Sequence, residues 1–288
     1  MSAQNSGGAP EADDGYDHGS GTPLLLLHGI GGSWHIWKPV LRLLETRHRV
    51  IALTLPGHCD GPECSVTGEA TVGGLADQLI EMMRARGVTQ AHVAGNSLGG
   101  WLSLELARRG FARSVTALSP AGGWSDIAHF RQLARRFRIF YALMPLILFL
   151  SSPFLRFAGF RRALGRETME HADRMPPEEF RLSLRAMTKS RIFLTLLRTI
   201  GRDGPLRALA AGHVPVRIAW CERDRVIPFE RFGRPIVAAL PHAEATVIPG
   251  VGHVPMYDDP QAVANQILEL TARVDAADPQ LQTQRAAA

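Results

Sequence analysis

Residues 91–100 read AHVAGNSLGG, a short apolar run that leads into Gly-x-Ser-x-Gly and then into a helix-forming stretch. This pattern is typical of a nucleophile elbow, in which a serine stands on a tight turn between a strand and a helix. The serine has a strained backbone there, and Gly95 and Gly99 leave room for the close approach of strand and helix. We therefore expect Ser97 at the carboxyl edge of a sheet and a helix from Leu98, whose N-terminal amides face any oxyanion formed there. The alternative is a tight turn with an incidental serine.

Short apolar runs alternate with helical patterns on both sides of this turn. We expect strands at residues 23–27, 49–53, 92–94, 115–118, 216–220 and 245–248, and helices at 37–45, 75–86, 98–109, 231–240 and 260–273. Such alternation predicts an α/β fold, with a mostly parallel sheet that carries helices on both faces. Residues 122–211 lack a convincing strand pattern and are helical and arginine-rich, which predicts an inserted helical segment.

The 288 residues therefore divide into one α/β domain, residues 21–121 and 212–275, and the insertion at 122–211. Residues 1–20 are rich in Gly, Ser, Ala and acidic side chains, and they lack the basic and apolar regions of a secretory signal. We expect them to be a disordered tail. Residues 276–288 are equally poor in core-forming side chains and are expected to fray.

A serine alcohol becomes a good nucleophile only when a base takes its proton and an acid orients that base. Asp224 follows the expected strand at 216–220, and His253 follows the one at 245–248. The order Ser97, Asp224, His253 therefore places three catalytic candidates just beyond three strands. Glu222 is the substitute acid if Asp224 does not orient the histidine. The competing interpretations are a surface Asp224 paired with a neighbouring arginine, and a His253 that only caps a loop.

Residues 24–34 read LLLLHGIGGSW, an apolar strand that ends in glycines. Such a loop can turn backbone N–H groups inward, as an oxyanion hole requires. We assign the two donors to the amides of Ile30 and Leu98. A dinucleotide-binding loop is disfavoured, because the third glycine of Gly-x-Gly-x-x-Gly and the acidic residue that should follow are missing. We expect neither a metal nor an organic cofactor.

In combination these motifs resemble the α/β-hydrolase fold superfamily over residues 22–275, apart from the insertion. The motifs that carry the resemblance are His28-Gly29, LPGH at residues 55–58, GNSLGG at residues 95–100, Asp224, and Gly252-His253. The resemblance implies that residues 122–211 form a helical cap over the active site. It also implies supporting roles for His28, Gly29, Gly95, Asn96 and Gly99.

The resemblance is less specific for the substrate. With Asn96 before the serine, the chain resembles the meta-cleavage C–C bond hydrolases. Those enzymes usually carry Trp after the catalytic histidine, where this chain has Val254. Epoxide hydrolases and haloalkane dehalogenases use an Asp nucleophile, whereas position 97 is serine. Thr54 stands where the family usually has an acidic residue, which we interpret as a local change.

The net charge is +5 and the isoelectric point is near 9.6. Residues 122–206 hold 15 basic against 7 acidic side chains, so the basic excess belongs to the insertion. Without a polybasic run, nucleic acid is not an expected partner. The three cysteines form no CxxC pair, which disfavours both a disulfide framework and a zinc site and favours a reducing, cytoplasmic setting.

The insertion contains a nearly unbroken apolar stretch at residues 139–155, with Pro145 and Pro153 inside it. At 17 residues it is short for a transmembrane helix, so we do not expect a span. In the first interpretation it packs on the domain and lines an acyl pocket, while the arginines around it are solvated. In the second the cap also makes peripheral contact with an anionic membrane. A homodimer contact is the third interpretation.

Both the acyl-pocket interpretation and the membrane-contact interpretation favour a lipophilic substrate. We expect a serine hydrolase that cleaves a small lipophilic carboxylic ester. The alternatives are hydrolysis of a C–C bond, thioester, lactone or amide, and a non-catalytic protein of hydrolase fold that binds a ligand.

Overall fold

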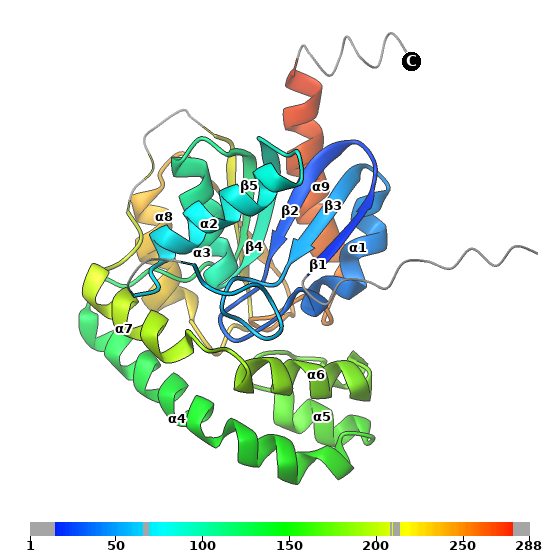
Figure 1. The fold of residues 1–288 in the computed structure, drawn as a ribbon, viewed down its shortest axis with the longest axis vertical. Coiled ribbons are helices and arrows are strands. Elements are labelled where there is room, and N and C mark those ends of the chain that lie inside the picture. The colour runs from blue at the N-terminus through cyan, green and yellow to red at the C-terminus, as the bar shows by residue number, and fades with distance from the viewer. Residues whose placement is uncertain (1–14, 66–68, 208, 210–213, 279–288) are drawn as a thin grey trace, which may run out of the picture.

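The computed structural model describes residues 15–65, 69–207, 209 and 214–278. Within these residues seven strands form one sheet in the order β1-β3-β2-β4-β5-β6-β7 (Figure 1). The strands are β1 (Gly15–Gly19), β2 (Thr22–Leu27), β3 (His48–Leu53), β4 (Ala91–Asn96), β5 (Ala112–Leu118), β6 (Val216–Cys221) and β7 (Glu244–Ile248). Neighbours pair in parallel throughout, except that β1 runs antiparallel to β3 at the edge.

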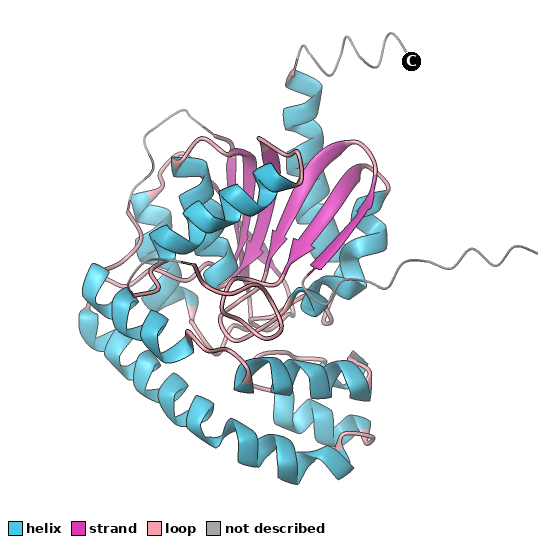
Figure 2. Cartoon of the chain, in the orientation of Figure 1, coloured by secondary structure: helices cyan, strands magenta, loops and turns pink. Residues whose placement is uncertain are grey.

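Helices cover both faces of the sheet, as Figure 2 shows. On one face α1 (Lys38–Glu45) and α9 (Pro260–Ala277) pack together against Leu24, Leu26 and Ala94. On the other, α2 (Val72–Ala85), α3 (Leu98–Arg108) and α8 (Arg234–Ala239) pack against Leu25, Leu27 and Val93. Alternate residues of one strand thus enter opposite cores. The expected α/β fold with a mostly parallel sheet is confirmed.

The carboxyl ends of the parallel strands meet at one edge of the sheet, where open α/β sheets bind their ligands. β4 lies between β2 and β5 and is buried along its whole length, and it ends at Asn96, directly before Ser97. Asp224 follows β6 and His253 follows β7. The sheet therefore delivers all three predicted residues to the same edge.

The insertion lies between β5 and β6. Its helices are α4 (Ile127–Ser151), α5 (Ala158–Gly165), α6 (Pro177–Thr188) and α7 (Phe193–Asp203), with short 3₁₀ turns at Ser152–Phe154 and Ala172–Arg174. The described part of residues 122–211 contains no strand. In Figure 1 these helices form a layer across the carboxyl ends of the strands, with α4 farthest from the sheet. We call α4–α7 the helical insertion.

Polar and aromatic contacts hold the helical insertion to itself and to the α/β domain. The Tyr141 hydroxyl of α4 donates to the Ser190 carbonyl at 3.1 Å, and its ring stacks on Phe193 with centroids 4.6 Å apart. The amide of Arg191 donates to the Gly57 carbonyl at 2.9 Å. Because these bonds join α4 and the α6–α7 turn to a loop of the α/β domain, the insertion is anchored beside that loop.

Two expectations for the chain ends were wrong where the structure describes them. Residues 15–19 are not a disordered tail but strand β1, because they pair with β3, Tyr16 is buried near Trp34, and Asp17 forms a double salt bridge with Arg49. Residues 276 and 277 continue α9 instead of fraying. The rest of both predicted tails, residues 1–14 and 279–288, lies outside the described residues.

Candidate active site

Ser97 occupies a strained turn between β4 and α3. Its φ of 57° and ψ of −116° are unfavourable for a residue with a side chain. The Ser97 amide donates to the Leu118 carbonyl at 3.0 Å, which fixes the turn on β5. A Cβ at Gly95 would lie 2.1 Å from the Gly99 carbonyl oxygen, and one at Gly99 would lie 2.1 Å from that of Leu27. The predicted glycines are thus required for strand and helix to approach.

Asp224 and His253 are paired. Asp224 Oδ2 lies 2.6 Å from His253 Nδ1, and both side chains are buried. Asp224 Oδ1 accepts the amides of Val226 and Ile227 at 2.9 and 2.8 Å, so the carboxylate is fixed in the β6 loop. Glu222, the substitute acid, instead accepts a backbone amide of the next loop at 2.7 Å. The geometry therefore favours Asp224 as the partner of His253.

The arginines next to Asp224 do not pair with it. Arg223 and Arg225 both form salt bridges with Glu170 of the helical insertion. Burial by itself would raise the pKa of Glu170, but the two cations together lower it. The interpretation of Asp224 as a surface carboxylate held by its neighbours is therefore wrong.

Asn96 links the serine turn to the histidine loop. Its side-chain amide donates to the His253 carbonyl at 2.8 Å and to the Leu118 carbonyl at 3.2 Å. Within the described residues no hydrogen bond joins Ser97 Oγ to the His253 ring. The structure thus brings the three predicted residues to one place through Asn96 and pairs two of them directly.

Asp258 is a buried residue that the sequence reasoning missed. Its carboxylate accepts hydrogen bonds from the amides of Gly252, Glu170 and His171 at 2.7–2.9 Å. The Asp258 residue is almost completely buried. The amide of Val254, on the other side of His253, donates to an insertion carbonyl, that of Thr168, at 2.8 Å. The histidine loop is therefore held on both sides of His253. In sequence, Asp258 stands before the N-terminus of α9 and is hard to distinguish from a helix-capping residue.

The predicted oxyanion loop lies against Ser97. A Cβ at Gly29 would lie 3.2 Å from Ser97 Cβ, and the Gly32 amide closes a turn on the Gly29 carbonyl at 3.1 Å. The amide of Leu98 is the first of α3 and has no acceptor within the helix. Among the described residues, neither this amide nor that of Ile30 donates to a protein acceptor.

His28 shapes this loop. Its Nε2 accepts the Leu55 amide at 2.9 Å, so the proton is on Nδ1, which donates to the Gly29 carbonyl at 2.7 Å. The His58 ring lies edge-on with its centroid 5.3 Å away, and its buried Nε2 has no hydrogen-bond partner in the described part of the chain. Burial, with a smaller effect from the facing His58, lowers the pKa of His28 to about 3, and burial lowers the pKa of His58 to about 4.

These two histidines predict a strong loss of stability in mild acid. Their folded-state pKa values lie below the ordinary 6.5, so the unfolded chain takes up their protons first and stability falls as pH decreases from about 6.5 toward 4. At 1.36 kcal/mol per pKa unit, the pair costs on the order of 5 kcal/mol at pH 4.5 relative to pH 7. Urea unfolding at pH 7.0, 5.5 and 4.5 measures this loss.

The variant His58→Gln isolates one of the two contributions. It should remove about half of the loss of unfolding free energy that His28 and His58 together cause in acid. His18→Gln, which changes an exposed histidine on β1, is the control and should keep the wild-type profile. A wild-type stability that stays constant between pH 7.0 and 4.5 would contradict the burial of two neutral rings.

Apolar side chains of the helical insertion approach the loops around Ser97. A Cβ at Gly31, in the oxyanion loop, would lie within 3.3 Å of Met187 and Phe193, and one at Gly57 would meet Ile192 at 2.6 Å. Both glycines lack a Cβ, which permits this close approach, and both have a positive φ, which side chains disfavour. The α6–α7 turn therefore borders the candidate site with hydrophobic groups.

Thr54 fills the position at which an acidic residue was expected. It is buried, and its hydroxyl accepts the Trp34 amide at 3.4 Å, just after the oxyanion loop. The position therefore retains a polar contact that supports the loop, consistent with a local change.

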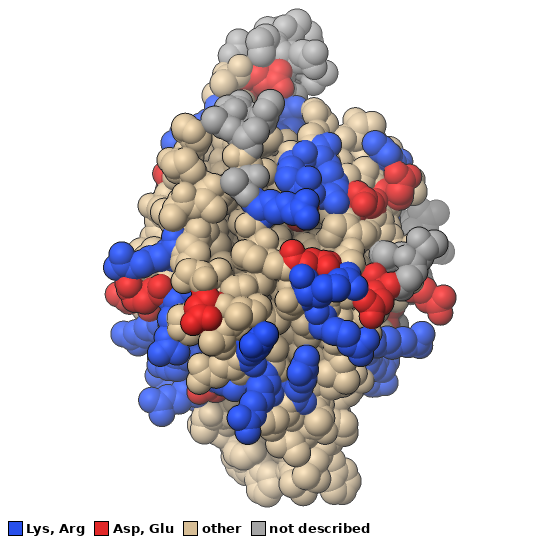
Figure 3. All heavy atoms as spheres, turned by 90° about the vertical axis from the view of Figure 1, so that its left-hand side faces the viewer, with Lys and Arg blue, Asp and Glu red and all other residues tan. Residues whose placement is uncertain are grey.

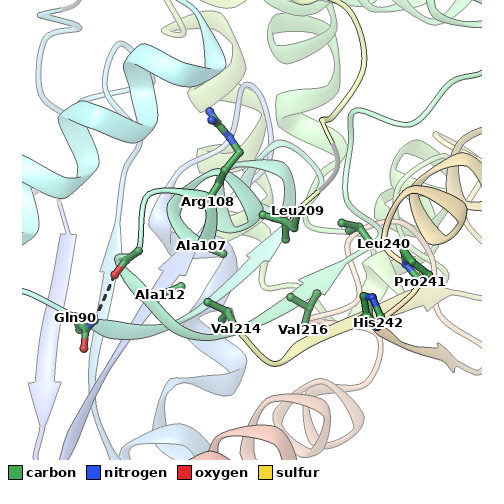
Figure 4. Close-up of a pocket in the computed structure, with 12 residues that line it drawn as sticks. Gln90, Ala107, Arg108, Ala112, Leu209, Val214, Val216, Leu240, Pro241 and His242 are labelled. Carbon is green, nitrogen blue, oxygen red and sulfur yellow. Dashed lines mark hydrogen bonds between the residues drawn. The ribbon is translucent and has the colours of Figure 1, made fainter. Parts of the chain in front are cut away.

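Two surface hollows lie away from this site. Their volumes are about 430 and 690 Å³, and both are lined by Gln90, Ala112 and Val216, which stand at the amino ends of β4, β5 and β6. Figure 4 shows the first of the two. Ser97 follows the carboxyl end of β4, so neither hollow belongs to the candidate site. Among the described residues, no group of three or more His, Cys, Asp or Glu side chains is placed to hold a metal ion.

Comparison with known sequences finds several similar proteins. The profile of a family described as the alpha/beta hydrolase family matches residues 24–266. The epoxide hydrolase EphH of Mycobacterium tuberculosis is 33% identical over 196 residues, which cover 67% of this chain and 91% of that protein. RutD of Azorhizobium caulinodans, which is assigned as a carbamate hydrolase, is 29% identical over 76% of this chain and 80% of its own length.

Comparison with solved structures agrees on the fold. The structure of an esterase from Thermogutta terrifontis superposes with a TM-score of 0.67 at 20% identity, over 90% of this chain and 93% of the esterase. At this identity the likeness concerns the fold alone.

Proposed function

The chain belongs to the α/β-hydrolase family, and on that premise we propose that it is a serine hydrolase that cleaves a carboxylic ester with a lipophilic acyl or alcohol part. The observation that carries the proposal is the serine at position 97, held at φ 57° beside the oxyanion loop, with the Asp224–His253 pair at the same edge of the sheet. Strained residues of this kind cluster at active sites.

In the proposed reaction Ser97 Oγ attacks the ester carbonyl while His253 Nε2 takes the hydroxyl proton. Asp224 keeps the ring in the tautomer with its proton on Nδ1 and stabilises the imidazolium. The amides of Ile30 and Leu98 donate to the oxyanion. His253 then gives the proton to the leaving alcohol, and an acyl-enzyme remains on Ser97. Water, deprotonated by His253, releases the carboxylic acid and restores the serine.

Epoxide opening, the activity in the name of the EphH relative, fits this nucleophile poorly. A carboxylate that opens an epoxide forms an ester, which water can then hydrolyse. A serine alkoxide would form an ether, which the same machinery cannot cleave. A carbamate differs from an epoxide because serine attack on it produces a carbamoyl-enzyme, which water can hydrolyse. Carbamates therefore belong in the substrate panel, together with thioesters, lactones, amides and meta-cleavage products.

A lipophilic substrate is supported by Met187, Ile192 and Phe193, the apolar groups that border the loops around Ser97. The test is a series of p-nitrophenyl esters from acetate to laurate, assayed beside styrene oxide, a carbamate and a meta-cleavage product. We expect kcat/KM to be at least tenfold higher for the octanoate than for the acetate, because each buried methylene favours binding. A preference for acetate would contradict the lipophilic assignment. Turnover of the epoxide or the C–C substrate without ester hydrolysis would overturn the proposed function, and turnover of nothing in the panel would favour a ligand-binding protein.

A further inference from the structure

The outer face of α4 is strongly apolar and exposed. Among the described residues, eight of the thirteen exposed large hydrophobic side chains fall between residues 139 and 157. Ile139, Leu143, Leu146 and Leu150 are spaced three or four residues apart, so they share one face of the helix. Phe149 beside them is 76% exposed. We call the exposed hydrophobic side chains of residues 139–157 the apolar face.

Exposed apolar groups in such number are costly in water unless another surface covers them. By length and composition alone, Ile127–Phe154 could cross a membrane. Only 11% of its most apolar 18-residue stretch is buried in the fold. The other side of α4 is used, because Phe130, Ala134 and Met144 are buried. Since α4 is already packed along one side, the apolar face is suited to contact a surface and not to span a bilayer.

The chain segment that carries the apolar face holds charges of one sign. Between Asp126 and Glu167 the chain holds eight arginines and no acidic residue. Arg131, Arg135 and Arg138 precede the apolar face on α4, and Arg156 lies within it with its guanidinium 4.7 Å from the Phe157 ring. No ion pair joins these four arginines to an acidic side chain in the described parts of the chain. Their charge is therefore available to an anionic partner.

Figure 3 shows how the two features are arranged. Uncharged atoms cover the lower end of the molecule, and Lys and Arg side chains gather above it. In Figure 1 that end of the molecule is formed by the C-terminal part of α4 and by α5. An apolar end below a basic band matches the order of acyl chains and anionic headgroups in a lipid leaflet.

We propose that the apolar face and the arginines around it dock the protein on the surface of an anionic lipid bilayer. Phe149, Leu150 and their neighbours enter the boundary between headgroups and acyl chains, while Arg135, Arg138 and Arg156 contact lipid phosphates. A second copy of the chain is the less favoured occupant, because two such faces would bring their arginines together. The proposal does not depend on the proposed esterase activity.

Flotation of the purified full chain with vesicles tests this docking. We expect at least tenfold more protein to bind vesicles of phosphatidylcholine and phosphatidylglycerol at 7:3 than vesicles of phosphatidylcholine alone, with binding reduced in 500 mM NaCl. Phe149→Glu/Leu150→Glu should reduce binding at least tenfold, and Arg138→Gln should reduce it about fivefold on anionic vesicles only. Val247→Glu, at a 60% exposed position on β7, is the matched control and should bind like wild type.

Each alternative has its own outcome. Release of the bound protein by alkaline carbonate supports docking, and retention would overturn it in favour of insertion across the bilayer. The apolar face would instead be assigned to a second copy of the chain if the wild-type protein did not bind anionic vesicles, formed a dimer, and became a monomer in the double variant. Circular dichroism and melting temperature show whether the double variant is folded. If it is not folded, the test rests on Arg138→Gln alone. Unchanged binding by Arg138→Gln would contradict the proposal.

Discussion

Replacing Ser97 by alanine is expected to lower kcat/KM for a p-nitrophenyl ester by about 10⁴-fold to 10⁶-fold while leaving the fold intact. The reason is that the alanine variant cannot form an acyl-enzyme, so only binding and the oxyanion donors remain. Loss of the hydroxyl removes no hydrogen bond between side chains in the described residues, so the unfolding free energy should change by less than about 1 kcal/mol. Initial rates and urea unfolding measure the two quantities.

Ser119 provides the matched control for this variant. It is also buried, it also has a positive φ, 38°, and it follows the carboxyl end of the adjacent strand β5. Its hydroxyl accepts the Cys221 amide at 3.0 Å, which is a structural contact. Ser119→Ala should therefore retain activity within tenfold and lose some stability. If Ser97→Ala kept its activity, or lost no more than Ser119→Ala, the assignment of Ser97 as nucleophile would fail.

The second large effect is expected for Asp224→Asn, with a loss of about 10⁴-fold in kcat, the size seen for the equivalent change in serine proteases. Asp224 Oδ1 accepts two backbone amides, so the oxygen of the asparagine side chain must remain there and its NH₂ group must face His253. An NH₂ donor at His253 Nδ1 forces the ring proton onto Nε2. That nitrogen can then no longer accept the proton of Ser97.

Glu222→Gln is the control for Asp224→Asn. Glu222 is exposed and its side chain accepts the Gly250 amide of the neighbouring loop, so kcat should change less than threefold. Steady-state kinetics on the two variants distinguish the acids. A larger loss in Glu222→Gln than in Asp224→Asn would show that the substitute acid supports His253 in solution.

The parts of the fold that could be predicted are those whose pattern is local and repeated. The apolar runs before Ser97, Asp224 and His253 mark buried parallel strands, and the chain order of the three residues then places them at one sheet edge. The turn at Ser97 was recognisable because only small neighbours permit its backbone.

Other features depend on contacts that sequence does not encode locally. β1 reads GYDHG, with no apolar run, and it forms because β3 presents an open edge and Trp34 covers Tyr16. Asp258 joins the histidine loop to amides of the helical insertion that lie 88 and 87 positions away in sequence. The apolar stretch of α4 was evident, but which of its sides the α/β domain and the other insertion helices would cover depends on tertiary packing.

Labelling with a fluorophosphonate probe tests the central claim, that Ser97 is an activated nucleophile, most directly. The wild-type protein should take up one probe per chain, and peptide mass spectrometry should place it on Ser97. Ser97→Ala should remain unlabelled and Ser119→Ala should label like wild type. A wild-type protein that does not react, or a Ser97→Ala variant that reacts equally well, would contradict the proposed serine hydrolase.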